Sequence, residues 1–217
     1  MNFSEIENLK SAFSKDLPGS EAQFKMASSF RFTPEYIEEQ RPKARYGSVM
    51  VLLFPVDNII HTVLTLRTSY KGVHSGQVSF PGGKRDEADP DLVVTALRET
   101  WEEVGVPDYD ISVIGSLTEL YIPASNFIVT PYIGVVNDRP EFHANRREVE
   151  KIIETPLSIL LDDSIRKQTK IKINDDLVID APYFDIDNQV VWGATAMMLS
   201  ELAEIIRPHF FAEPANY

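Results

Sequence analysis

Cysteine is missing from this 217-residue chain, so disulfide bonds, thiolate metal sites and cysteine nucleophiles are excluded. Basic residues are scarce: 21 Lys and Arg stand against 33 Asp and Glu, which gives a formal net charge of −12. Broad nucleic-acid binding needs a basic footprint, so no nucleic-acid partner is expected. No apolar run approaches the roughly 18 residues of a membrane span, and residues 1–5 lack a basic leader, so we expect a cytoplasmic protein without membrane association.

The composition nevertheless supports a sizeable core, with 43% hydrophobic and 10% aromatic residues, in one domain with decorations or at most two small ones. Period and turn signals predict strands at 44–56, 59–67, 77–80, 111–122, 128–136, 148–154, 165–173 and 183–191. They predict helices at 4–15, 33–40, 156–161 and 193–206, and a central helix ending at Gly105. This order predicts an α/β fold with helices on a mixed sheet.

The stretch before residue 41 has no clean period between residues 19 and 32. We therefore expect residues 1–40 to form an N-terminal helical extension and residues 41–217 to form the main domain. The extension is expected to pack on the core or on a partner subunit, and a homodimer would follow from the second arrangement.

The chain is organised around residues 80–106, which read FPGGKRDEADPDLVVTALRETWEEVGV. Helical spacing predicts one buried stripe, made of Val93, Ala96, Leu97, Thr100, Trp101 and Val104. Glu99, Glu102 and Glu103 fall on another face within about one turn, so their carboxylates can converge on one point. Such a cluster is either a solvated acidic face or a site for a hard divalent cation with oxygen ligands, Mg²⁺ or Mn²⁺.

The glycine pair before this helix favours the metal site. Pro81, Gly82 and Gly83 predict a tight turn, and a glycine backbone can approach a ligand or metal closely because no Cβ intervenes. An acidic protein that handles phosphate groups would need metal ions and local Arg or Lys side chains to reverse the field at its site.

The glycine turn and the acidic helix together resemble the Nudix box, G-x5-E-x7-R-E-U-x-E-E-x-G-U, in which U is a bulky apolar residue. Gly83 begins the match, and residues 98–106 complete it, except that Thr100 occupies an apolar position. The first half is one residue longer than the pattern, and Pro90 stands where the box has glutamate. Asp89 is the expected substitute and Asp86 the second choice. The resemblance implies a Nudix α/β/α sandwich with a mixed β-sheet and the box helix against that sheet.

A second signature lies just upstream. Residues 64–86, LTLRTSYKGVHSGQVSFPGGKRD, resemble the extended signature of the coenzyme A pyrophosphatase branch of the Nudix hydrolases. Gly72 replaces the arginine of that signature, and Lys71 or Arg67 would have to supply its charge. Residues 145–161 and 192–196 resemble further segments of the branch, so the likeness covers roughly residues 44–206.

The resemblance also implies roles for individual residues. Glu102 and Glu103 correspond to metal ligands, Glu99 to a third ligand or the base that deprotonates water, and Gly82 to a backbone carbonyl ligand. Arg98 is expected to hold the glutamates, with a guanidinium fork on Glu102 one turn away.

Further candidates lie outside the helix. Glu148 is a secondary candidate for the base or a further ligand. Contacts to the substrate are expected from Arg67, His74, Gly83, Lys84 and Arg85. Trp101 is assigned to the core, whereas Trp192 and Tyr121 could either pack or stack on a base.

Three functions compete. The first is metal-dependent cleavage of coenzyme A or acyl-CoA to 3′,5′-ADP and (acyl-)4′-phosphopantetheine. The second is hydrolysis of another nucleoside diphosphate derivative, such as ADP-ribose or NADH, which Gly72 favours. The third is a binding module without turnover, which would have no need of all three carboxylates. In each case the partner is a small nucleotide-like molecule.

Overall fold

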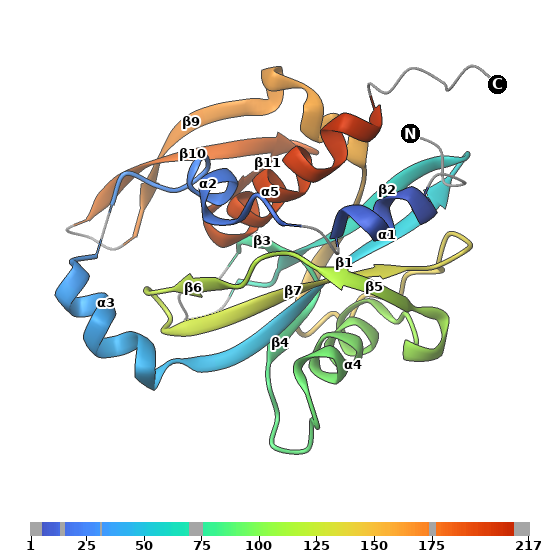
Figure 1. Ribbon diagram of the computed structural model, residues 1–217, viewed down its shortest axis with the longest axis horizontal. Helices are drawn as coiled ribbons and strands as arrows, with labels where there is room; N and C mark the ends of the chain where they lie inside the picture. Colours follow the sequence, from blue (N-terminus) through green and yellow to red (C-terminus); the bar gives the residue numbers. More distant parts are fainter. Residues whose placement is uncertain (1–5, 14–15, 31, 70–75, 174–176, 211–217) are drawn as a thin grey trace.

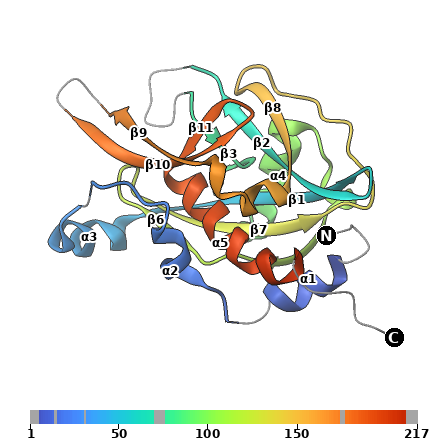
Figure 2. The same cartoon turned by 90° about the horizontal axis from the view of Figure 1, so that it is seen from above.

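The structure, a computed structural model, describes residues 6–13, 16–30, 32–69, 76–173 and 177–210 (Figures 1 and 2). Its helices are α1 (Ile6–Phe13), α2 (Gly19–Phe24), α3 (Pro34–Gln40), α4 (Leu92–Val104) and α5 (Gly193–Phe210). Its strands are β1 (Arg45–Val56), β2 (Ile59–Arg67), β3 (Val78–Ser79), β4 (Gly82–Lys84), β5 (Ser112–Ser116), β6 (Leu120–Ile122), β7 (Phe127–Val135), β8 (Val149–Pro156), β9 (Arg166–Lys172), β10 (Val178–Ile186) and β11 (Gln189–Trp192). Short 3₁₀ turns lie at Arg41–Lys43, Asp108–Asp110, Leu157–Leu161 and Asp163–Ile165.

Within these ranges eight strands form one mixed sheet in the order β3-β2-β1-β7-β5, with β4 paired to β1, β6 to β7 and β8 to β2. β1 and β7 run parallel, and the other pairs are antiparallel. In Figure 1, α4 covers the lower face of the sheet, while α5 and a smaller sheet, β11-β10-β9, lie above it. The expected α/β/α sandwich with a mixed sheet is therefore confirmed.

The central strand β1 reads as a nearly continuous apolar run because both of its faces are buried. Side chains alternate across a strand, so Met50, Leu52 and Phe54 enter the core shared with α4, while Val51 and Leu53 enter the core shared with α5. All five are fully buried. β1 is thereby fixed in register, which in turn fixes the strands that carry the site.

The N-terminal segment packs on the core of its own chain. Phe13 and Met26 belong to the core that α5 completes, and α2 lies against α5 (Figure 2). The fully buried carboxylate of Glu201 on α5 accepts hydrogen bonds from the Gly19 backbone amide, the Gln23 side chain, and the amide and hydroxyl of Thr118. The boundary after residue 40 and the homodimer stay predictions.

Several predicted elements were wrong in detail because long-range pairing decides them. The glycine stretch is strand β4, held in the sheet by antiparallel pairing with β1, and not a tight turn. Residues 111–122 form two strands, β5 and β6, that pair with β7 at different places. The expected last strand pair is a three-stranded sheet. Residues 19–24 form a helix, and α5 continues through Pro208.

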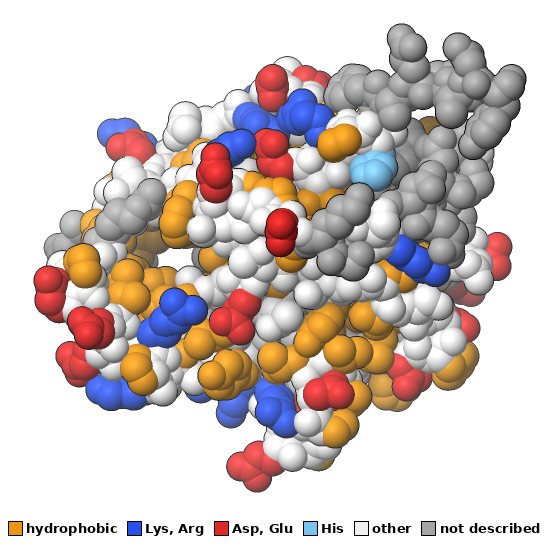
Figure 3. Space-filling view, in the orientation of Figure 1, with side chains coloured by type: hydrophobic (Ala, Val, Ile, Leu, Met, Phe, Trp, Pro, Cys, Tyr) orange, Lys and Arg blue, Asp and Glu red, His pale blue; other side chains and the backbone are white. Residues whose placement is uncertain are grey.

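Acidic side chains are scattered among basic ones on the face shown in Figure 3, so the net negative charge does not form one patch there. In the described part of the chain, no helix is long and apolar enough to span a membrane.

Candidate active site

Helix α4 carries the acidic residues, and both of its ends are specified locally. Asp91 caps the N-terminus: its Oδ1 accepts a hydrogen bond from the Val94 amide at 2.9 Å, which satisfies one of the free N–H groups of the first turn. Gly105 ends the helix in the left-handed conformation, with φ +79°, where glycine pays no steric cost.

The buried face of α4 differs from the predicted one. It is centred on Ala96, Thr100, Glu103 and Val104, whereas Trp101 is 60% exposed, so the assignment of Trp101 to the core was wrong. The helix is rotated so that an acidic residue faces the sheet in place of the tryptophan. This rotation brings the glutamates to strand β4 and the end of β2.

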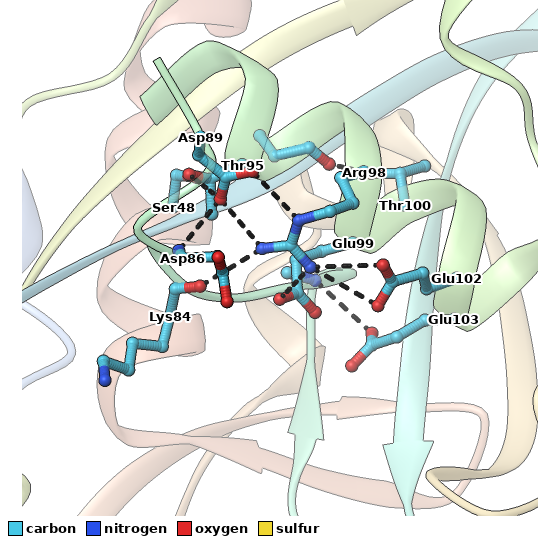
Figure 4. A network of polar contacts seen from close by, with 12 residues as sticks. Ser48, Lys84, Asp86, Asp89, Thr95, Arg98, Glu99, Thr100, Glu102 and Glu103 are labelled. Carbon is cyan, nitrogen blue, oxygen red and sulfur yellow. Dashed lines mark hydrogen bonds and ion pairs between the residues drawn. The ribbon is translucent and has the colours of Figure 1, made fainter. Parts of the chain in front are cut away.

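Arg98 lies at the centre of a polar network that ties α4 to the preceding loop (Figure 4). Its Nε donates to Asp89 Oδ1 at 3.1 Å and its Nη2 to Oδ2 at 2.9 Å. Asp89 is buried and accepts further bonds from the Asp86 amide and the Thr95 hydroxyl. The Arg98 hydrogen bonds, more than any other cause, hold the pKa of Asp89 well below its usual range. Asp89 therefore supplies the carboxylate that Pro90 could not.

The guanidinium fork of Arg98 thus engages Asp89 and not Glu102, which corrects the prediction. The remaining nitrogen, Nη1, donates to Glu99 at 2.8 Å and to the two oxygens of Glu102 at 3.3 and 3.4 Å. Arg98 holds both glutamates, as expected, but through a single nitrogen. Thr95, which orients Asp89, was not anticipated; its position six residues after Asp89 carries no local signal.

The two glycines of β4 let the backbone approach the acids. The Gly82 amide donates to Glu103 Oε2 at 3.3 Å. A Cβ on Gly83 would lie 2.5 Å from the carboxyl carbon of Glu99. The carboxylate of Glu99 therefore lies directly over the β4 backbone, and only glycine leaves room for it.

Glu103 is the most deeply buried of the three glutamates, with its side chain 2% exposed. Its Oε1 accepts a hydrogen bond from Arg67 Nη1 at 3.1 Å. Burial raises the pKa of Glu103 to about 7, against the opposing effect of Arg67. Burial also raises the pKa of Glu99. The exposed Glu148 adds repulsion at both carboxylates, which places it beside the cluster. Two carboxyls that burial makes hard to ionise favour a cation at this position.

The sequence matches the NUDIX domain model over residues 45–171, more than half of the chain. This chain belongs to the Nudix hydrolase family. Over 143 residues it is 38% identical to the uncharacterized Nudix hydrolase NudL of Yersinia enterocolitica, covering 65% of this chain and 72% of that protein. The protein of the same description from Yersinia pestis is 37% identical, with 65% and 70% covered.

Among solved structures, the Nudix hydrolase RenU from M. smegmatis superposes with a TM-score of 0.54 and 14% identity, covering 80% of this chain and 91% of RenU. This likeness concerns the fold. Family membership makes this chain a Nudix pyrophosphatase, and Nudix hydrolases typically use a divalent metal ion.

The donor set of this Nudix site fits such an ion in its chemistry, because carboxylate and carbonyl oxygens are the ligands that Mg²⁺ and Mn²⁺ prefer. Among the described residues, however, no three His, Cys, Asp or Glu side chains are arranged to hold a metal. The expected convergence of three carboxylates on one point is therefore absent here. The reason is visible: Glu99 and Glu102 converge on Arg98, while Glu103 turns to Arg67.

The other predicted contacts stay predictions. The Lys84 side chain is exposed and extends away from the network, although its carbonyl accepts from Arg98 (Figure 4). Arg85 donates to the carbonyls of Asp89 and Pro90 and so braces the loop. His74 lies outside the described residues.

The two aromatic residues left open differ in their surroundings. The Tyr121 hydroxyl donates to Asn126 Oδ1 at 3.0 Å, and Arg41 lies over its ring. Trp192 ends β11 and is partly buried. Local contacts therefore account for Tyr121 without a ligand.

Proposed function

We propose that this Nudix hydrolase cleaves the diphosphate linkage of coenzyme A or acyl-CoA, giving 3′,5′-ADP and (acyl-)4′-phosphopantetheine. The observation that carries this proposal is the α4 carboxylate cluster, set against the glycines of β4 directly after the extended signature of residues 64–86. The cluster supports the reaction type, and the signature supports the substrate.

Glu99, Glu102 and Glu103, with the Gly82 carbonyl, are the groups that would hold a divalent ion. When bound, this ion would neutralise charge on the diphosphate oxygens. The roles of the protein groups follow from their positions. Glu99, whose pKa is raised by burial, or Glu148 at the edge of the cluster accepts the proton of the attacking water. Arg98 keeps Glu99 and Glu102 oriented because Asp89 locks it.

Arg67 contributes the guanidinium nearest the buried glutamate and is the phosphate contact in this scheme. A planar guanidinium matches two phosphate oxygens. Lys84, Arg85 and His74 remain additional proposed contacts to the substrate.

The experiment is chromatographic analysis of coenzyme A and acetyl-CoA incubated with the protein and Mg²⁺ or Mn²⁺. We expect 3′,5′-ADP and the matching phosphopantetheine. Glu103→Gln should abolish turnover, whereas Glu154→Gln, which alters an exposed pair with Arg139, should not.

A second substrate class is kept because Gly72 occupies the place of the signature arginine. ADP-ribose and NADH are therefore included in the same panel. Intact coenzyme A alongside consumed ADP-ribose or NADH would replace the proposed substrate with this class. Metal binding without hydrolysis of any diphosphate would indicate a binding module.

A further inference from the structure

Two guanidinium groups occupy the carboxylate cluster, and they are held very differently. Arg98 donates to both oxygens of Asp89, to Glu99, to Glu102 and to the Lys84 carbonyl. Arg67 makes one side-chain hydrogen bond among the described residues, from Nη1 to Glu103. Its Nε is buried and finds no acceptor in the described part of the chain. Displacing Arg67 therefore breaks one ion pair, whereas displacing Arg98 would break its hydrogen bonds to three carboxylates and one carbonyl.

The fold places Arg67 over Glu103 for structural reasons. Side chains alternate along a strand, so Arg67 lies on the same face of β2 as Val63, which packs in the core between the sheet and α4. The pairing of β2 with β8 shifts register between Leu66 and Arg67, where β8 carries one extra residue, Glu150. The guanidinium thus reaches a glutamate 36 residues away in sequence.

Both oxygens of Glu103 are already used by the protein. Oε2 accepts from the Gly82 amide in β4, a rigid backbone donor, and Oε1 accepts from Arg67. A cation that binds Glu103 through Oε1 leaves the Gly82 bond intact, which fixes the carboxylate, but it meets the Arg67 guanidinium on the same oxygen. Steric and charge exclusion prevent a guanidinium and a divalent ion from sharing that oxygen closely.

We infer that Arg67 is an internal counter-cation that exchanges with the catalytic metal at Glu103, and that the released guanidinium then becomes available to the phosphate of the substrate. This inference rests on the proposed function and deepens it. Arg67 thus has two roles: it keeps the buried carboxylate paired without metal, and it is freed to bind an anion only when metal has replaced it. Metal binding and phosphate binding are coupled through one side chain.

The first consequence concerns metal affinity in the absence of any phosphate ligand. Removing the competing guanidinium by Arg67→Met should tighten Mn²⁺ binding by at least about 5-fold, the lower end of typical coupling between sites. Mn²⁺ titration followed by electron paramagnetic resonance in a phosphate-free buffer measures this directly, without turnover. In hydrolysis assays the same variant should show a raised KM at saturating Mn²⁺, since the freed guanidinium is lost to the substrate.

A control separates exchange from a general field effect. Arg139→Met removes an arginine of an exposed pair with Glu154 and makes the same change in net charge, so its Mn²⁺ affinity should equal that of the wild type. In a Glu103→Gln background, Arg67→Met should no longer tighten Mn²⁺ binding, because no carboxylate remains to be contested. An equal gain in that background would mean a through-space effect and would overturn the inference.

Crystals of the wild-type protein soaked in Mn²⁺ give a test that needs no variant. We expect Glu103 to bind the metal with Arg67 displaced from Oε1. Metal bound while the Arg67–Glu103 pair stays intact would refute the exchange, as would Arg67→Met binding Mn²⁺ no tighter than the wild type. Exchange observed without coenzyme A hydrolysis would leave the inference standing and remove only the proposed substrate.

Discussion

Replacing Asp89 by asparagine tests the Asp89–Arg98 ion pair, called here the clamp, which orients the site. Four donors converge on the two carboxylate oxygens: Arg98 Nε on Oδ1, and Arg98 Nη2, the Thr95 hydroxyl and the Asp86 amide on Oδ2. An amide must place its NH₂ group against at least one of these donors. The least crowded choice is the Oδ1 position, where it would face the Nε–H of Arg98 and lose both that bond and the charge.

The expected cost follows from burial. Breaking a fully buried ion pair by removing one partner costs about 3–5 kcal/mol. Asp89 is 4% exposed, but Arg98 keeps 27% of its side-chain exposure, so water compensates part of the loss. We expect Asp89→Asn to lower the free energy of unfolding by about 2–3 kcal/mol, which for a chain of this size lowers Tm by about 5–10 °C.

Urea unfolding at pH 7, with Glu154→Gln as the control, measures this cost. Glu154 forms a bidentate but partly exposed pair with Arg139, and such surface pairs contribute at most about 1 kcal/mol. A loss in Asp89→Asn no larger than in this control would refute the clamp.

The pH dependence gives an independent check of the same variant. Because the pKa of Asp89 is depressed in the folded state, its stabilising effect is complete above the unfolded value of about 3.9 and fades as the pH falls below it. The difference between wild type and Asp89→Asn should therefore stay constant from about pH 7 to pH 5 and shrink in stronger acid. A difference that grows on acidification would contradict the assignment.

Four further predictions concern the glycines and the buried glutamates. Gly83→Ala should fold but lose activity and Mn²⁺ affinity, because its Cβ displaces the movable carboxylate of Glu99. Gly82→Ala should unfold at lower urea concentration than the wild type, because its Cβ would lie 2.4 Å from the β1 backbone. A Gly82→Ala variant as stable as the wild type would contradict this. In EDTA, the free energy of unfolding of the wild type relative to Glu103→Gln should fall between about pH 5 and about pH 7.5, because ionising a carboxyl of pKa about 7 disfavours the folded state. Urea unfolding measures this difference, and a difference that does not change with pH would contradict the prediction. Glu201→Gln should lower the free energy of unfolding by about 2–3 kcal/mol. It should also speed amide hydrogen exchange in α2, because Glu201 bonds Gly19 and Gln23 there, and unchanged exchange would contradict this.

Local signals explain what could be predicted from the sequence. Helix α4 could be predicted because its helical spacing and its final glycine both lie within residues 93–105. Asp89 could be proposed as the partner of the box because it directly precedes Pro90, which occupies the place of the missing glutamate. Strands β1 and β2 were found because the chain between them turns within two residues, Asp57 and Asn58, both with positive φ.

Long-range contacts decide the rest. Gly82 and Gly83 read as a turn by composition, and only their pairing with β1 makes them a strand. The rotation of α4 that exposes Trp101 is set by the sheet, since an acid can be buried when a donor from another strand meets it. Glu103 meets such donors from Gly82 and Arg67, and no spacing rule within one helix reveals partners that lie 21 and 36 residues away.

The charge of the carboxylate cluster gives a reason to expect that the proposed diphosphate substrate binds together with metal ions. Around Arg98 and Arg67 lie five carboxylates, those of Asp89, Glu99, Glu102, Glu103 and Glu148, so full ionisation leaves an excess of three negative charges. A diphosphate would be repelled by this excess. Burial, with added repulsion from Glu99, likewise raises the pKa of Glu103 to about 7. One divalent ion leaves the cluster still negative, whereas two reverse its sign. If two ions are needed, diphosphate binding should rise more steeply with Mn²⁺ concentration than the binding of a single Mn²⁺ ion does.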